Sequence, residues 1–148
     1  MWSQITKRRF THTQPTKQMQ KQTIDPWKWG EQTNSVQAVE IKQPEGTLYC
    51  SGQVAIDAAG QPSTADMRGQ LIQIFENLEH LIDTAGYECQ GIVRLNVFTT
   101  SMMEFFTTCG DVYQEWIAKH GIKQATTMFE VKGLYANLGV ELEATVVK

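Results

Sequence analysis

Residues 63–86 carry the sequence pattern that most constrains the fold. Apolar residues recur there at steps of three and four positions, which is the spacing of one face of an α-helix. They are Met67, Leu71, Ile74, Phe75, Leu78, Leu81 and Ile82. Ser63 or Thr64 can cap the helix N-terminus, Asp66 complements its dipole, and Gly86 can adopt the left-handed conformation that ends it. The pattern predicts an amphipathic helix, whose apolar face needs a sheet or a second helix to cover it.

A second helix is predicted over residues 101–121. It opens with a capping box, in which Ser101 and Glu104 satisfy each other's backbone N–H groups, and it ends at Gly121. Gly110 lies inside this helix at a cost of about 1 kcal/mol relative to alanine. We therefore expect another group to approach the backbone closely at that position.

Five segments show the alternation or the composition of β-strands. They are residues 35–41, 47–51, 92–99, 125–132 and 139–147. A turn at residues 43–46 joins the first two strands in a hairpin, and a loop joins the last two in another. The resulting order, ββαβαββ, predicts an α+β domain of split-βαβ type, with two helices on one face of a single mixed sheet. Because the other face is uncovered, we expect a homo-oligomer.

The N-terminal segment differs in charge from the rest of the chain. Five of the 13 basic residues and none of the 16 acidic ones lie in residues 1–23, so the remaining 125 residues carry a net charge of −8. Low hydrophobicity cannot offset the entropy of ordering, so we expect residues 1–23 to be a disordered basic tail and residues 24–148 to form the domain. A mitochondrial transit peptide is an alternative interpretation of the tail. The acidic domain predicts no nucleic-acid partner.

Cysteine and histidine residues give no sign of a disulfide framework or a metal site. They are widely spaced and form no CxxC or HExxH pattern: Cys50, Cys89, Cys109, His12, His80 and His120. We therefore expect reduced thiols, no bound metal and a cytoplasmic location. No stretch approaches the ~18 consecutive apolar residues of a membrane helix, so no membrane partner is expected either.

Four segments, taken in order, resemble the reactive-intermediate deaminase family, also called the Rid or YjgF-like family. Residues 48–53 resemble the family's SGQ strand, and residues 77–86 resemble the end of its first helix. Residues 93–99 match its central strand, and residues 140–144 match its closing VEIEA strand. The order and spacing of these motifs make the resemblance specific, and it covers residues 24–148.

The resemblance implies a chorismate-mutase-like fold assembled as a homotrimer, in which the sheets form a barrel core and the sites lie in clefts between subunits. It also implies that water adds to a small imine or enamine and that ammonia is released, with no metal and no organic cofactor. In the family, an arginine binds the substrate carboxylate and a glutamate on the last strand orients the attacking water. Glu141 matches that glutamate, so it is the predicted catalytic residue.

The sequence departs from the family pattern at three positions of the expected site. Thr126 stands at the arginine position, Ser35 at a tyrosine position and Gly110 at an asparagine position. Threonine cannot make the bidentate charged contact of arginine, so the expected small-molecule ligand lacks a carboxylate or binds it otherwise. Arg94 is a candidate replacement, or else a partner in a surface ion pair. The predicted ligand-binding residues are Ser51, Gly52, Thr126, Thr127, Ser35 and Gly110.

Three functions remain open from the sequence. The first is a Rid-like hydrolase or deaminase, in which Glu141 assists water addition while Ser51 and nearby backbone N–H groups polarise the substrate. The second is a small-molecule-binding or regulatory trimer without catalysis, and the third is an interaction module whose basic tail recruits a partner. A carboxylate that merely faces solvent on an alternating strand is the other interpretation of Glu141.

Overall fold

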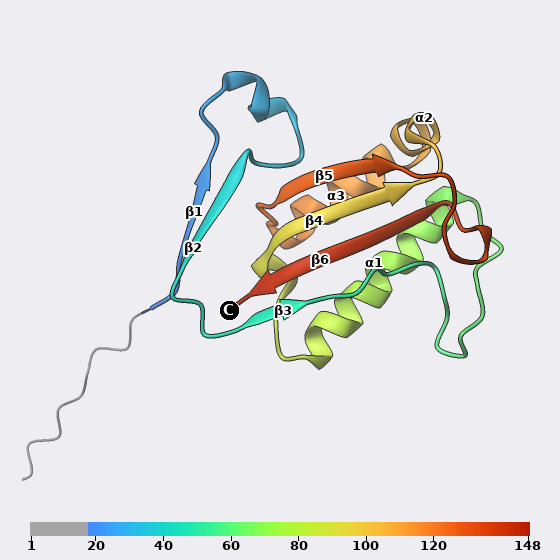
Figure 1. Cartoon of the computed structure of the whole chain (residues 1–148), viewed down its shortest axis with the longest axis horizontal. Helices are drawn as coiled ribbons and strands as arrows, with labels where there is room; N and C mark the ends of the chain where they lie inside the picture. The colour runs from blue at the N-terminus through green and yellow to red at the C-terminus, as the bar shows by residue number, and fades with distance from the viewer. Residues whose placement is uncertain (1–17) are drawn as a thin grey trace, which may run out of the picture.

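The computed structural model describes residues 18–148, and the fold is built on one four-stranded sheet (Figure 1). Its strands lie in the order β3 (Thr47–Tyr49), β6 (Val140–Val147), β4 (Ile92–Thr99) and β5 (Ala125–Glu130). β4 and β5 are parallel, whereas β6 is antiparallel to both of its neighbours. This sheet is therefore mixed, as predicted.

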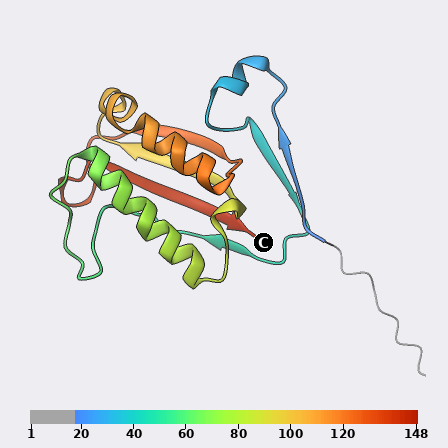
Figure 2. The same cartoon turned by 180° about the vertical axis from the view of Figure 1, so that it is seen from behind.

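Two helical connections cover one face of the sheet (Figure 2). α1 (Met67–Thr84) precedes β4, and the second connection links β4 to β5. That connection begins with α2 (Met102–Glu104), continues through a π-helical turn at Phe105–Cys109 and ends with α3 (Gly110–His120). The predicted α+β architecture, with its helices on one face, is confirmed.

Alternation along the strands separates a buried face from an open one. The residues of β4 and β6 that face the helices are almost fully buried: Ile92, Leu95, Val97, Thr99, Val140, Leu142, Ala144 and Val146. The apolar stripe of α1 packs on them, since Leu71, Ile74 and Leu78 are completely buried. Phe75 of α1 also stacks on Trp116 of α3, with ring centroids 4.4 Å apart, so the two helices share one core.

The helix ends follow the predicted chemistry with two exceptions. The capping box at Ser101 is half formed, because the Ser101 N–H donates to Thr99 Oγ1 at 3.2 Å rather than to the Glu104 side chain. Ser101 accepts a hydrogen bond from the Glu104 backbone N–H, and Gly86 and Gly121 have φ values of 74° and 60°. The cap of α1, however, is Asp66, whose carboxylate accepts from the Gly69 N–H at 2.8 Å. The prediction of a Ser63 or Thr64 cap was therefore wrong, because the Ser63 hydroxyl accepts instead from the Ala65 N–H.

Both predicted hairpins were wrong. β2 (Ala38–Lys42) pairs with β1 (Gln20–Ile24) rather than with β3, and these two strands form a separate ribbon beside the main sheet (Figure 1). At the other end of the chain, β4 lies between β5 and β6. The parallel crossover places β5 on one edge of β4, and β6 pairs with the opposite edge of β4 instead of with β5.

The predicted disordered tail overlaps this ribbon. Residues 1–17 lie outside the part of the chain that the structure describes. Residues 20–23 belong to β1, so the boundary predicted at residue 24 was wrong for them. Their side chains are mostly exposed, and the ladder to β2 holds them through backbone hydrogen bonds, which do not require apolar residues. Lys21 adds a hydrogen bond from its ammonium group to the Gln90 carbonyl oxygen, at 3.1 Å.

The three cysteines are free and buried, as expected. Burial raises the pKa of each thiol, and that of Cys89 rises to about 11. None of them is therefore an activated nucleophile.

The partly buried carboxylate of Glu79 links α1 to α3. Glu79 Oε1 accepts hydrogen bonds from Trp116 Nε1 at 2.9 Å, Lys119 Nζ at 3.0 Å and His120 Nε2 at 2.7 Å. Burial alone would raise the pKa of Glu79, but these hydrogen bonds outweigh it and lower the pKa to about 2. The ionised carboxylate is therefore part of the folded state.

We expect Glu79→Gln to lower the free energy of unfolding by about 1 kcal/mol at pH 7, because Glu79 is partly exposed and water screens its contacts. The folded pKa lies below the ordinary value of 4.5, so this stabilisation is complete above pH 4.5 and is lost as the pH falls through 2. Urea denaturation at a series of pH values measures it, with exposed Glu76→Gln as the control. A difference that stays constant down to pH 2 would contradict this account.

Candidate functional site

Glu141 lies on the open face of the sheet. In the register of β6 with β4 it is opposite Phe98, while its neighbours Val140 and Leu142 point into the core. The carboxyl group is half-buried, and its pKa is raised, first by burial and then by repulsion from Glu143 two residues away. A raised pKa makes this carboxylate a stronger base than an ordinary glutamate, which suits it to accept a proton and return it.

Ser51 and Gly52 lie beside this carboxylate. The Cys50 N–H donates to the Ala144 carbonyl and the Gln53 N–H to the Leu142 carbonyl, so Ser51 and Gly52 together oppose the single residue Glu143. This is the two-against-one arrangement of a β-bulge. A methyl group on Gly52 would lie 2.7 Å from Glu141 Cδ, so only glycine leaves room for the carboxyl group as it is placed.

A second group of predicted residues lies around a cavity of about 410 Å³ on the helix side of β5. Thr126, which is opposite buried Leu95 in the β4–β5 register, lines it together with Ser35 and Gly110. A side chain at Gly110 would meet no atom within 4 Å, so the predicted close approach to this glycine was wrong. Gly110 instead follows the π-helical turn and leaves the cavity wall open.

Thr127 and Arg94 belong to the open face rather than to this cavity. Arg94 Nη2 donates to Thr127 Oγ1 at 3.2 Å, and strand alternation places both side chains on the face opposite Thr126. Arg94 therefore does not take the place of an arginine at position 126. The six predicted binding residues and Glu141 thus form two groups, Glu141 with Ser51, Gly52 and Thr127 on one face and Ser35 with Gly110 and Thr126 on the other.

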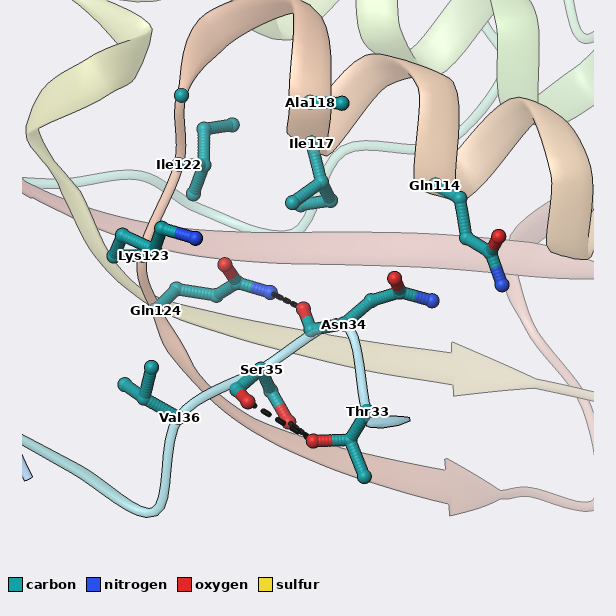
Figure 3. A pocket seen from close by; sticks show the side chains of 11 residues that line it. Thr33, Asn34, Ser35, Val36, Gln114, Ile117, Ala118, Ile122, Lys123 and Gln124 are labelled. Carbon is teal, nitrogen blue, oxygen red and sulfur yellow. Dashed lines mark hydrogen bonds between the residues drawn. The ribbon is translucent and has the colours of Figure 1, made fainter. Parts of the chain in front are cut away.

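Two buried residues near Thr126 were not predicted to belong to the site. Tyr113 lines the cavity and is 6% exposed, and Gln124 is completely buried in an adjoining cavity of about 250 Å³ (Figure 3). Gln124 Nε2 donates to the Asn34 carbonyl at 2.6 Å and to Thr126 Oγ1 at 3.2 Å. Hydrophobic periodicity does not identify buried polar residues. The only sequence feature that could have pointed to Gln124 is its position directly before a strand.

Within residues 18–148, no three side chains of His, Cys, Asp or Glu gather as they would around a metal ion. No helix of the same residues has the length and apolar character needed to cross a membrane.

The family profile and the related sequences that match this chain point to one family. Residues 32–148 match the profile of the family described as "Endoribonuclease L-PSP". A RutC family protein of Aquifex aeolicus is 30% identical over 112 residues, which cover 76% of this chain and 86% of the relative. A 2-iminobutanoate/2-iminopropanoate deaminase of Salmonella typhimurium is 27% identical over 102 residues, which cover 68% and 79%.

A solved structure agrees with these relatives. The Rid family protein YyfB of Yersinia pestis, whose function is given as unknown, superposes with a TM-score of 0.71 at 25% identity. The match covers 86% of this chain and 98% of that protein. The fold, the motifs and the family profile therefore agree, and the chain belongs to the endoribonuclease L-PSP family, which includes the Rid proteins.

Proposed function

We propose that this protein is a Rid-type hydrolase that adds water to a small imine or enamine and releases ammonia. The observation that carries the proposal is Glu141, a half-buried carboxyl group with a raised pKa that fits against Gly52 beside Ser51. Its ionised form accepts a proton from water as the water oxygen bonds to the C=N carbon. That proton passes to the nitrogen and gives a carbinolamine. The proton of its new hydroxyl group then moves to the same nitrogen as the C–N bond breaks, so a carbonyl compound and ammonia leave.

The complete site in this proposal is formed by two copies of the chain. Glu141 and the cavity around Thr126 lie on opposite faces of one sheet, so a small ligand contacts both only where the open face of one copy meets the cavity of another. Phe98 and Phe129 stack on the open face, and Phe129 is 40% exposed, as is typical of a surface that a partner covers. We infer a homotrimer in the cytoplasm, with one site at each contact.

The substrate proposed here is not a simple imino acid. The Salmonella relative is named for two imino acids, both of which carry a carboxylate. Among residues 18–148, hydroxyl, amide, aromatic and apolar side chains line the cavity around Thr126, and no basic residue does. A carboxylate placed there would lose its hydration without gaining a counter-charge.

A trimer that binds a small molecule without catalysis is the second candidate. The observation that favours it is the same lack of a basic residue among the described residues that line the cavity, since they do not supply the contact that the family uses to hold a substrate.

Ammonia release from freshly generated imines tests the two candidates, using neutral imines and imines that bear a carboxylate. We expect wild type to consume neutral imines and Glu141→Gln to be slower by about 100-fold or more, because the amide cannot accept the proton. Thermal denaturation of both proteins is the control for folding. Folded wild type that releases no ammonia from any imine would contradict the hydrolase and leave the binding protein.

Gly52→Ala tests the fit of Glu141 against the strand bulge. The new methyl group displaces the carboxyl end of a flexible side chain, so we expect a loss of turnover with a change in unfolding free energy below about 1 kcal/mol. Gly133→Ala is a matched control, since a methyl group at Gly133 meets no atom within 4 Å. Equal turnover in both variants would show that the placement of Glu141 is unimportant.

The repulsion between Glu141 and Glu143 predicts a shift in titration. Glu143→Gln removes a neighbouring negative charge, so we expect the pKa of Glu141 to fall and the acidic limb of a pH–rate profile to move to lower pH. Carboxyl ¹³C NMR measures the pKa without any substrate. Glu45→Gln, in the turn before β3 and near the C-terminal end of β6, is the control. A pKa of Glu141 that does not change would mean that burial alone raises it.

A further inference from the structure

A cavity of about 630 Å³ lies between the β1–β2 ribbon and the main body of the protein (Figure 1). Its walls come from β1, from the segment that joins α1 to β4, from the segment that joins α3 to β5 and from the last residues of β6. Glu141 lies at the other end of β6, and the cavity shares no residue with the one around Thr126. This cavity is therefore separate from the site described above.

Lysines dominate the charge of this cavity. Three of them line it, Lys21, Lys123 and Lys148, and Glu88 is the one acidic residue among the described residues of the wall. Within residues 18–148, no carboxylate forms an ion pair with any of the three lysines. Residues 1–17 contain no aspartate or glutamate, so they cannot supply a counter-charge either. Three positive charges against one negative charge leave the cavity with a surplus of two, in a chain whose net charge is −3.

Two of the three ammonium groups are held in place by uncharged groups. Lys21 Nζ donates a hydrogen bond to the Gln90 carbonyl oxygen at 3.1 Å. Lys148 Nζ donates to the Gly86 carbonyl oxygen at 3.1 Å and lies 4.3 Å from the centre of the Tyr87 ring. An ammonium group has three N–H donors, so each of these two keeps two donors that no described residue uses. Because these groups are already positioned, a ligand that binds them orders few side chains.

Lys21 and Lys123 differ in their exposure. Lys21 is partly buried, and burial lowers the pKa of its ammonium group. A partly dehydrated cation without a counter-ion is unfavourable, so an anion in the cavity would stabilise it. Lys123 is exposed and forms no hydrogen bond within residues 18–148, so its flexible side chain is free to turn toward the same anion.

We propose that this cavity binds the phosphate group of a small molecule through the ammonium groups of Lys21, Lys123 and Lys148. Lysine binds phosphate as a point charge, and phosphate oxygens accept hydrogen bonds from several donors at once. A phosphate monoester carries about two negative charges at neutral pH, which balance the surplus of positive charge, whereas a carboxylate balances half of it. Free phosphate and a small phosphate ester share this chemistry, and the cavity has room for either. The site does not depend on the proposed hydrolase.

A phosphate group bound here connects the ribbon to the body of the protein. Lys21 belongs to β1, whereas Lys148 follows β6 in the main sheet. The side chains of β1 are mostly exposed, so little apolar burial holds the ribbon. Because a ligand that bridges the two parts opposes local opening, it should slow hydrogen exchange of the β1 amides.

Titration calorimetry with the full-length protein at constant ionic strength tests the binding. We expect glycerol 3-phosphate to bind with a dissociation constant below about 1 mM, and acetate to bind at least about tenfold more weakly, because acetate carries one charge. Inorganic phosphate that binds as tightly as glycerol 3-phosphate supports a site for free phosphate, and tighter binding of the ester supports a site for an organic phosphate. Failure of both compounds to saturate the protein at about 10 mM would overturn the proposal.

Charge variants locate the bound anion. Lys21→Gln, Lys123→Gln and Lys148→Gln should each weaken binding by about fivefold or more, because each removes a charge-assisted contact that water screens in part. Exposed Lys132→Gln, outside the cavity, removes the same charge and should leave binding unchanged. An equal loss in Lys132→Gln would overturn the proposal, since binding would then follow net charge alone. Melting temperatures without ligand verify that the variants are folded.

Glu88→Gln gives the converse test. Removing the acidic group of the described wall should tighten phosphate binding, whereas exposed Glu76→Gln, which also removes one negative charge, should not. Equal effects of the two variants would count against the site. Hydrogen exchange followed by mass spectrometry should slow in β1 when glycerol 3-phosphate is added to wild type, and not when it is added to Lys21→Gln. Unchanged exchange in β1 at saturation would rule out a site between the ribbon and the body.

Discussion

The pairing of β6 with β4 is the interaction on which the candidate site depends. Its register places Leu142 opposite Val97 and Ala144 opposite Leu95 in the core, which leaves Glu141 opposite Phe98 on the open face. A shift of one residue would turn the carboxylate into the core and an apolar residue outward, at a large cost in hydrophobic burial. Hydrophobic packing under α1 therefore determines where the carboxylate lies.

The two faces of the sheet carry different functional groups. Its open face has a carboxylate with a raised pKa, next to a bulge at Ser51 and Gly52 that leaves room for it. Its covered side has a neutral cavity whose buried hydroxyl and amide groups are fixed by Gln124. In the hydrolase that we propose, neither half is a complete site, and packing one copy against another is the simplest way to join them.

The parts of this arrangement that could be predicted are those that depend on residues close together in the sequence. The stripe of α1, the Ser101 cap and the alternation around Glu141 follow from residues close together in sequence. The partner of each strand does not, because alternation identifies a strand's faces and not its neighbours. For that reason β1 and the pairing of β2 were missed. Tyr113 and Gln124 were missed as neighbours of Thr126, because their position there depends on contacts distant in sequence.

The central claim is that one working site takes Glu141 from one copy and its cavity from another. Mixing of subunits from two variants tests this claim most directly. Glu141→Gln removes the carboxylate, and Gly110→Phe fills the cavity, since a side chain at Gly110 has open space. Each variant alone should be inactive in ammonia release. Unfolding and refolding the two together should restore part of the wild-type rate, because some contacts then pair an intact carboxylate with an intact cavity. Mixtures that stay as inactive as the separate variants, although size-exclusion chromatography shows mixed oligomers, would contradict the account.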